Sequence, residues 1–146
     1  QVFDRLLKEK NDRYLASLSS LSEDDILDGV HEFILKAKSS NHQIVLYSSS
    51  KNAKMILTKL NIITLFDVIV DGNDVTNSKP HPEGFELAAL LSNTAAQDCV
   101  VFEDSSSGIL AANQIGMTTI GIGDAKSLSM ASRIYENFKE ISLNDF

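Results

Sequence analysis

The sequence of 146 residues contains one cysteine, Cys99, and no long apolar run. A single cysteine forms no internal disulfide and excludes a cysteine-rich zinc site. No apolar run approaches the ~18–20 residues that span a bilayer, and the amino end carries no basic segment followed by an apolar signal core. The net charge of −7 disfavours nucleic acid or an anionic membrane as a partner. We therefore expect a cytoplasmic protein that binds neither nucleic acid nor membrane.

Two sequence motifs for nucleotide binding are also absent. The chain has no G-x-x-x-x-G-K-[ST] loop, and Gly121-Ile122-Gly123-Asp124 lacks the third glycine of a dinucleotide fingerprint. A nucleotide-dependent switch or ATPase is therefore disfavoured. The composition, 43% hydrophobic and 23% charged, is that of an ordinary globular domain.

Short apolar runs alternate with amphipathic helical patterns along the chain. The expected strands are 44–47, 66–70, 99–102 and 118–122, and the expected helices carry their apolar stripes within 2–19, 30–37, 53–60, 85–91, 109–115 and 128–138. Continuous apolar strands that alternate with helices indicate a parallel sheet covered on both faces. The sequence therefore predicts an α/β fold with a doubly wound, Rossmann-like parallel sheet, in which ligands bind at the carboxyl ends of the strands.

Polar side chains follow the first expected strand in the segment Ser48-Ser49-Ser50-Lys51-Asn52. Hydroxyls, an ammonium and an amide at the start of a helix favour an anion such as phosphate. A serine helix cap beside a solvated lysine explains the same residues. The segment by itself leaves both explanations open.

Lys79 follows the second expected strand, in Ser78-Lys79-Pro80-His81-Pro82. A residue before proline is held in an extended conformation, so this lysine is a point charge on a stiff loop, which suits a phosphoryl group. The prolines are equally consistent with a loop that starts the next helix.

Two adjacent carboxylates, Glu103 and Asp104, end the third expected strand. Bringing them together at the end of a buried strand costs free energy unless a cation or hydrogen-bond donors offset their repulsion. Hard oxygen ligands of this kind suit Mg²⁺. Asp104 or Ser105 could instead cap the following helix, but a cap explains only one of the two acids. We therefore favour the metal interpretation.

The order of these three segments, each after a strand, resembles the haloacid dehalogenase superfamily. Within it, the sequence is similar to the branch that contains β-phosphoglucomutase and related sugar-phosphate phosphatases. The resemblance extends from about Lys8 to Asp124. It implies that Ser48 binds the transferring phosphate, that Lys79 steadies the nucleophile and this phosphate, and that Glu103 and Asp104 hold Mg²⁺ directly or through water.

The resemblance also implies a substrate-binding role for four further residues. Ser50, Lys51 and Asn52 would hold the far phosphate of the substrate, and Lys10 would reach toward the substrate from the last helix of a helical cap domain. Residues 1–22 are accordingly expected to form that cap helix and a linker, and residues 23–146 the α/β core. The implied activity is Mg²⁺-dependent phosphoryl transfer to or from a small phosphorylated metabolite, such as the sugar phosphate β-glucose 1-phosphate, by a phosphatase or a phosphomutase.

One part of the family pattern is not found. The implied mechanism passes through an aspartyl-phosphate, and its nucleophile lies on a strand ending D-x-D, placed centrally between the strands of Tyr47 and Phe102. Val2-Phe3-Asp4-Arg5-Leu6 does not fit that motif. We therefore expect that an upstream segment of a parent chain supplies the nucleophile and that these 146 residues alone fold poorly and are inactive. The alternative is a truncated, non-catalytic domain that binds phosphate and Mg²⁺.

Overall fold

The computed structural model describes residues 29–145. Its helices and strands follow the order α2 (Val30–Ser39), β1 (Val45–Tyr47), α3 (Ala53–Lys59), β2 (Val68–Val70), α4 (Glu83–Leu91), β3 (Val100–Glu103), α5 (Ser106–Asn113), β4 (Thr118–Ile122) and β5 (Arg133–Tyr135). The expected helix over 2–19, the cap-and-linker segment 1–22 and Lys10 lie outside the described residues. From α2 to β4, the observed elements follow the predicted order.

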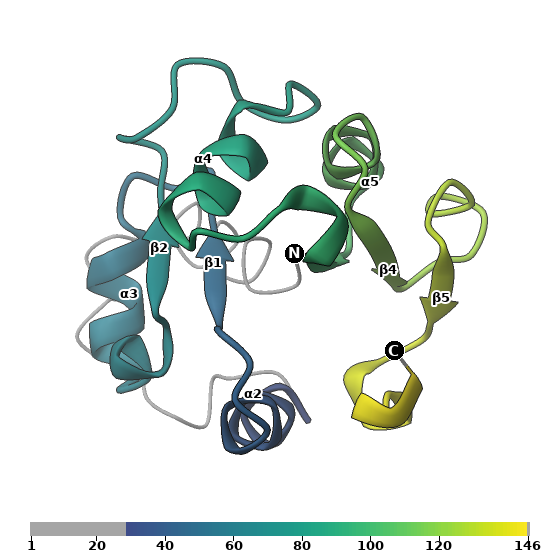
Figure 1. The fold of residues 1–146 in the computed structure, drawn as a ribbon, viewed down its shortest axis with the longest axis horizontal. Coiled ribbons are helices and arrows are strands. Elements are labelled where there is room, and N and C mark those ends of the chain that lie inside the picture. The colour runs from purple at the N-terminus through teal and green to yellow at the C-terminus, as the bar shows by residue number, and fades with distance from the viewer. Residues whose placement is uncertain (1–28, 146) are drawn as a thin grey trace.

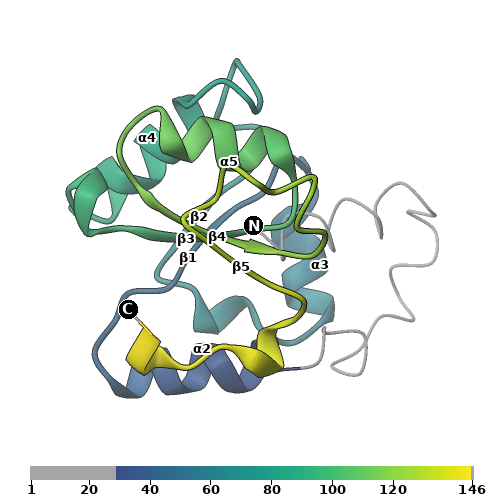
Figure 2. The same cartoon turned by 90° about the vertical axis from the view of Figure 1, so that its right-hand side faces the viewer.

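Helices cover both faces of the strands (Figure 2). Helices α4 and α5 lie on one face, and α2 and α3 lie on the other. Neighbouring residues of β1 point to opposite faces: Leu46 packs in the core with Ile34 of α2 and Ile56 of α3, whereas Tyr47 packs in a second core with Phe85 of α4. Because successive strand residues alternate between faces, a strand buried on both sides has no polar face. The predicted doubly wound α/β fold is confirmed.

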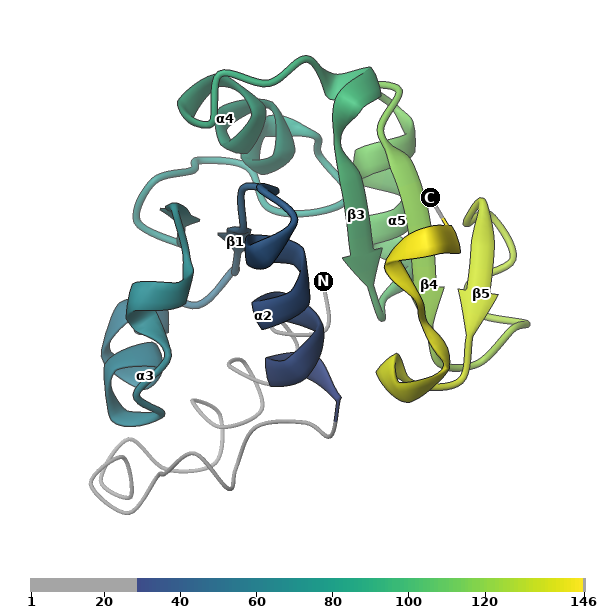
Figure 3. The ribbon, with the colours of Figure 1, turned by 60° about the horizontal axis from the view of Figure 1, so that its bottom comes forward.

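The strands form two parallel sheets, β1-β2 and β3-β4-β5, as Figures 1 and 3 show. In the first sheet Val45 pairs with Val68, and in the second Glu103 pairs with Gly121. Within residues 29–145, β1 and β3 therefore belong to separate sheets rather than to one.

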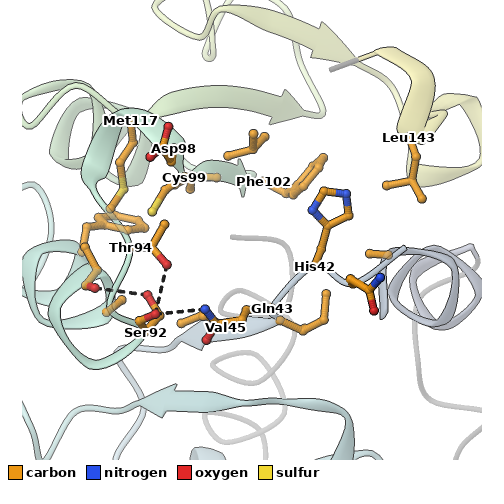
Figure 4. A pocket seen from close by; sticks show the side chains of 18 of the residues that line it. His42, Gln43, Val45, Ser92, Thr94, Asp98, Cys99, Phe102, Met117 and Leu143 are labelled. Atoms are coloured by element: carbon orange, nitrogen blue, oxygen red, sulfur yellow. Dashed lines mark hydrogen bonds between the residues drawn. The ribbon is translucent and has the colours of Figure 1, made fainter. Parts of the chain in front are cut away.

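A cavity of about 430 Å³ lies between the two sheets. In Figure 4, Val45 and Phe102 project toward it from opposite sides. Its lining includes Val45, Val100, Val101 and Phe102, but not Tyr47 or Glu103, which end β1 and β3. The cavity therefore lies toward the beginnings of these strands, away from their carboxyl ends.

The expected last helix, over 128–138, is wrong. Residues 133–135 form β5 instead, and Phe138–Glu140 form a short 3-10 helix. Asp124 starts a turn by accepting hydrogen bonds from the backbone N–H of Lys126 and the hydroxyl of Ser127. Strand β5 then pairs with β4, whose far edge would otherwise have no partner among the described residues. Strand pairing therefore overrides the helical spacing of the apolar residues, in a segment whose serines are weak helix formers.

Candidate active site

Lys79 and Glu103 form a buried ion pair. The ammonium Nζ of Lys79 lies 3.0 Å from Oε2 of Glu103, and their side chains are 5% and 1% exposed. Lys79 comes from the loop after β2, and Glu103 is the last residue of β3. The fold thus brings together two of the polar segments that the sequence placed after strands.

The other carboxylate oxygen of Glu103 is bound by the chain that follows it. Oε1 accepts hydrogen bonds from the backbone N–H groups of Asp104 and Ser105, at 3.0 and 3.1 Å, and from the hydroxyl of Ser105 at 2.9 Å. Burial acts to raise the pKa of Glu103, and the charge and hydrogen bond of Lys79 act to lower it. Because Glu103 pairs with an ammonium and accepts three further hydrogen bonds, it is a carboxylate at neutral pH.

Ser105, not Asp104, caps helix α5. The Ser105 hydroxyl oxygen accepts a hydrogen bond from the backbone N–H of Gly108 at 3.1 Å. The cap of α5 therefore uses neither Glu103 nor Asp104, and capping does not explain the two acids. Asp104 lies half-buried directly beside Glu103.

The acids at the end of β3 fit part of a Mg²⁺ site. Both supply hard carboxylate oxygens of the kind that Mg²⁺ prefers. Among the described residues, no three His, Cys, Asp or Glu side chains come together in a group that could hold a metal ion. Glu103 and Asp104 can therefore supply at most two of the ligands, and the others must come from water, from a substrate or from outside residues 29–145.

The loop after β1 is folded on itself and fastened to the end of β2. Ser48 is fully buried, its N–H donates to the carbonyl of Val70 at 2.9 Å, and its hydroxyl oxygen accepts from the N–H of Ser50 at 3.2 Å. The N–H of Gly72 donates to the carbonyl of Ser50 at 3.1 Å. This hydrogen bond uses the Ser48 hydroxyl only as an acceptor. Its O–H is a separate donor, of the kind that binds an anion.

Lys51 and Asn52 lie further along this loop, at the start of α3. The side-chain amide of Asn73, in the turn after β2, donates to the carbonyl of Lys51 at 3.1 Å. The side chain of Lys51 is exposed, and that of Asn52 makes no capping hydrogen bond. These two residues and Ser50 form a group braced against the β2 turn.

Tyr47 and Phe85 join the loop after β1 to the ion pair, and sequence analysis missed both. Nζ of Lys79 lies 4.6 Å from the ring centroid of Tyr47 and 5.4 Å from that of Phe85. Tyr47 directly precedes Ser48, so the carboxyl ends of β1 and β3 and the loop after β2 meet at Lys79. The sequence signal that could have indicated Tyr47 is its position as an aromatic residue immediately before the polar segment that begins at Ser48.

Glu83 and Gln114 also went undetected, and they hold the loop that carries Lys79. The Glu83 carboxylate accepts hydrogen bonds from the N–H of Thr76 at 2.5 Å and from that of Asn77 at 3.3 Å. The Thr76 hydrogen bond is the main cause of a pKa of Glu83 below its ordinary value. On the other side of Lys79, the side-chain amide of Gln114 donates to the carbonyl of Pro80 at 2.9 Å. The loop is therefore held on both sides of the lysine.

Comparisons with known proteins agree with this arrangement. A family model described as haloacid dehalogenase-like hydrolase matches residues 2–122. Beta-phosphoglucomutase of Bacillus subtilis is 33% identical over 94% of this chain and 61% of its own. A phosphorylated carbohydrates phosphatase of Thermotoga maritima is 32% identical over 92% of this chain and 57% of its own.

Solved structures give the same relationship. The crystal structure of beta-phosphoglucomutase from Clostridium difficile superposes with a TM-score of 0.87 and 35% identity, over 94% of this chain and 62% of that one. The chain thus spans less than two thirds of the length of these relatives. None of the helices within residues 29–145 is long and apolar enough to cross a membrane.

Proposed function

Because this chain belongs to the haloacid dehalogenase-like hydrolase family, we propose that it is the core of an enzyme that transfers phosphoryl groups of small phosphorylated metabolites. Its relatives include phosphatases and phosphomutases of phosphorylated sugars. The observation that carries the proposal is the buried Lys79–Glu103 pair at the carboxyl ends of the strands. A fixed cation at that edge suits a phosphorylated substrate, because negative charge is distributed over the phosphoryl oxygens in the transition state of phosphoryl transfer.

Each site residue has a distinct proposed role. Lys79 neutralises charge on the transferring phosphoryl group, and the Ser48 hydroxyl donates a hydrogen bond to one of its oxygens. Asp104 directly, and Glu103 through water, would hold Mg²⁺, which supplies Lewis-acid neutralisation of the phosphoryl oxygens when bound. Because both Glu103 oxygens already accept hydrogen bonds, we assign the direct contact with the ion to Asp104 and the orientation of Lys79 to Glu103.

The aspartyl nucleophile is proposed to come from a strand outside these 146 residues. The chain contains no strand pattern ending D-x-D, and β1 and β3 flank a cavity between two separate sheets. A strand inserted there could pair with both. Such an upstream segment of a parent chain is the proposed partner of this domain, and the cytoplasm is its proposed location.

The proposed substrates are sugar phosphates, with β-glucose 1-phosphate as the first to test. Ser50, Lys51 and Asn52, in the loop after β1, and Lys10 are assigned to the part of the substrate distant from the reacting phosphate. The exposed ammonium of Lys51 is available to an anionic group there. A phosphatase and a phosphomutase would use the same charged residues and differ in whether water or the substrate receives the phosphoryl group.

The decisive test is turnover by the chain joined to its upstream coding sequence. Phosphate release and sugar-phosphate isomerisation are followed with a panel of sugar phosphates, with Mg²⁺ and with EDTA. Mg²⁺-dependent turnover that Lys79→Ala abolishes would support the enzyme. A start codon immediately before Gln1, together with no turnover of any sugar phosphate, would contradict it.

A non-catalytic phosphate- and Mg²⁺-binding domain is the second candidate, favoured by the lack of a D-x-D strand in the chain. Titration calorimetry of the 146-residue chain with inorganic phosphate and with Mg²⁺ separates the two. Binding without turnover, in a protein whose gene encodes no further segment, would establish this candidate instead.

A further inference from the structure

The ammonium of Lys79 contacts the Glu103 carboxylate and the rings of Tyr47 and Phe85. Glu103 pairs with it at 3.0 Å, while the rings of Tyr47 and Phe85 lie at 4.6 and 5.4 Å from Nζ. The two rings meet edge to face, with centroids 5.1 Å apart and planes at 90°. Tyr47 is thus part of the immediate surroundings of the charge proposed to act on the substrate.

The position of the Tyr47 ring is tightly determined. Tyr47 is fully buried at the end of β1, and Phe85 of α4 is 1% exposed. Gly84, in the first turn of α4, lies against the ring so closely that a Cβ there would overlap Cζ, Cε2 and the phenolic oxygen. The ring therefore cannot swing toward α4, and its face stays under the loop that carries Lys79.

We propose that Tyr47 is a positioning residue for Lys79, holding the ammonium at the carboxyl edge of the strands through the face of its ring. A lysine ammonium is a point charge on a flexible four-carbon stem, so a single ion pair leaves its location poorly defined. The negative face of an aromatic ring attracts such a cation, most strongly where water is excluded. Glu103 on one side and Tyr47 on another thus fix the ammonium from two directions. The inference rests on the proposed role of Lys79 in phosphoryl transfer.

The first test is an NMR measurement that needs no activity. In the protein with its upstream segment, labelled at the lysine ε-carbons, the Lys79 signal is identified as the one lost in Lys79→Arg. Methylene protons above a ring face are shifted upfield by its ring current, so we expect the ε-protons of Lys79 upfield of those of exposed lysines. Tyr47→Phe retains this shift, and Tyr47→Leu reduces it to the contribution of the more distant Phe85 ring. An unchanged Lys79 signal in Tyr47→Leu would overturn the proposal.

Two further variants keep the NMR test decisive. Tyr135, in β5, is half-buried, and Tyr135→Leu serves as the matched control because it removes a tyrosine ring from another part of the fold. That variant is expected to leave the Lys79 signal in place. If Tyr47→Leu does not fold, as judged by far-UV circular dichroism, Tyr47→Met fills the site with a flexible apolar chain and is expected to shift the Lys79 signal in the same direction.

The second test is kinetic, on the protein with its upstream segment. Misplacing a charge that acts in the transition state lowers kcat more than it raises KM. We expect Tyr47→Leu to lower kcat about 10-fold with KM nearly unchanged, and Tyr47→Phe to restore most of the loss. A shifted NMR signal with wild-type kcat would overturn the positioning role. An inactive wild-type enzyme would instead refute the proposed function. The NMR result would still test whether Tyr47 fixes the position of the Lys79 ammonium.

Discussion

Gly108 lies directly against the carboxylate of Glu103, and a Cβ at position 108 would overlap the Cδ and Oε2 atoms of that side chain. The glycine stands in the first turn of α5, where the helix passes the end of β3. Its lack of a side chain leaves the space in which Glu103 meets Lys79. Helix α5 and the ion pair are therefore compatible only with this residue at this position.

A methyl group at position 108 is expected to disrupt the ion pair. Gly108→Ala forces the Glu103 carboxylate away from Lys79, and overpacking of a buried site costs about 1–3 kcal/mol of unfolding free energy. Chemical denaturation measures this loss. Ser106→Ala, at an exposed position of the same turn, is the control and should change stability by less than about 0.5 kcal/mol. Equal stability of the two variants would show that Glu103 can move without cost.

The stability of the protein is expected to fall with pH as Glu103 becomes protonated. The Lys79 ammonium acts to hold the folded-state pKa of Glu103 below its ordinary value of 4.5, so the contribution of this ion pair to stability is complete above 4.5 and is lost as the pH falls through the lower, folded pKa. Unfolding free energies between pH 7 and pH 3 measure the effect, and Glu103→Gln should flatten the curve in the acidic range. Glu86→Gln, at an exposed position of α4, should keep the wild-type slope, and an identical slope for both variants would remove Glu103 from this role.

Asp104 is expected to matter for Mg²⁺ rather than for folding. Asn has nearly the same shape as Asp, so Asp104→Asn should preserve the packing of this half-buried side chain, which does not cap α5. Mg²⁺ affinity, measured by calorimetry in the protein with its upstream segment, should fall about 10-fold or more because a carboxylate ligand is lost. Asp98→Asn, at an exposed acid before β3, is the control. Wild-type Mg²⁺ affinity in Asp104→Asn would exclude it as a ligand.

Glu83 is expected to hold the loop that carries Lys79. Glu83→Gln weakens the hydrogen bonds from Thr76 and Asn77, because a neutral amide oxygen accepts less strongly than a carboxylate. Amide hydrogen exchange at Thr76 and Asn77 should therefore become faster, while exchange within α4 changes little. Glu86→Gln provides the comparison on the same helix. If exchange at Thr76 is equally slow in both variants, the carboxylate does not hold this loop.

Much of the fold followed from local pattern, because buried strands and amphipathic helices have distinct periods. The same reasoning found Lys79 and Glu103, since polar residues after parallel strands converge on one edge of the fold. It failed at 128–138, where the choice between helix and strand depended on pairing with β4, which local pattern does not reveal.

The surroundings of Lys79 were beyond local pattern. Tyr47 precedes Lys79 by 32 positions, and their contact exists only because β1 and the loop after β2 end side by side. In the same way, a glutamate at the start of a helix is explained by ordinary dipole complementarity. That Glu83 also holds Thr76 depends on the path of a loop with no periodic signal.

The loop that carries Lys79 is bound at both ends of helix α5, by Glu103 just before the helix and by Gln114 at its last turn. Glu103 precedes the first turn of α5 and binds Lys79, and Gln114 at the last turn binds the carbonyl of Pro80. Opening the loop therefore breaks contacts at both ends of the helix at once. Loop and helix are expected to open as one cooperative unit, with a shared free energy of opening. The cation proposed to meet the substrate would then be no more mobile than helix α5 itself.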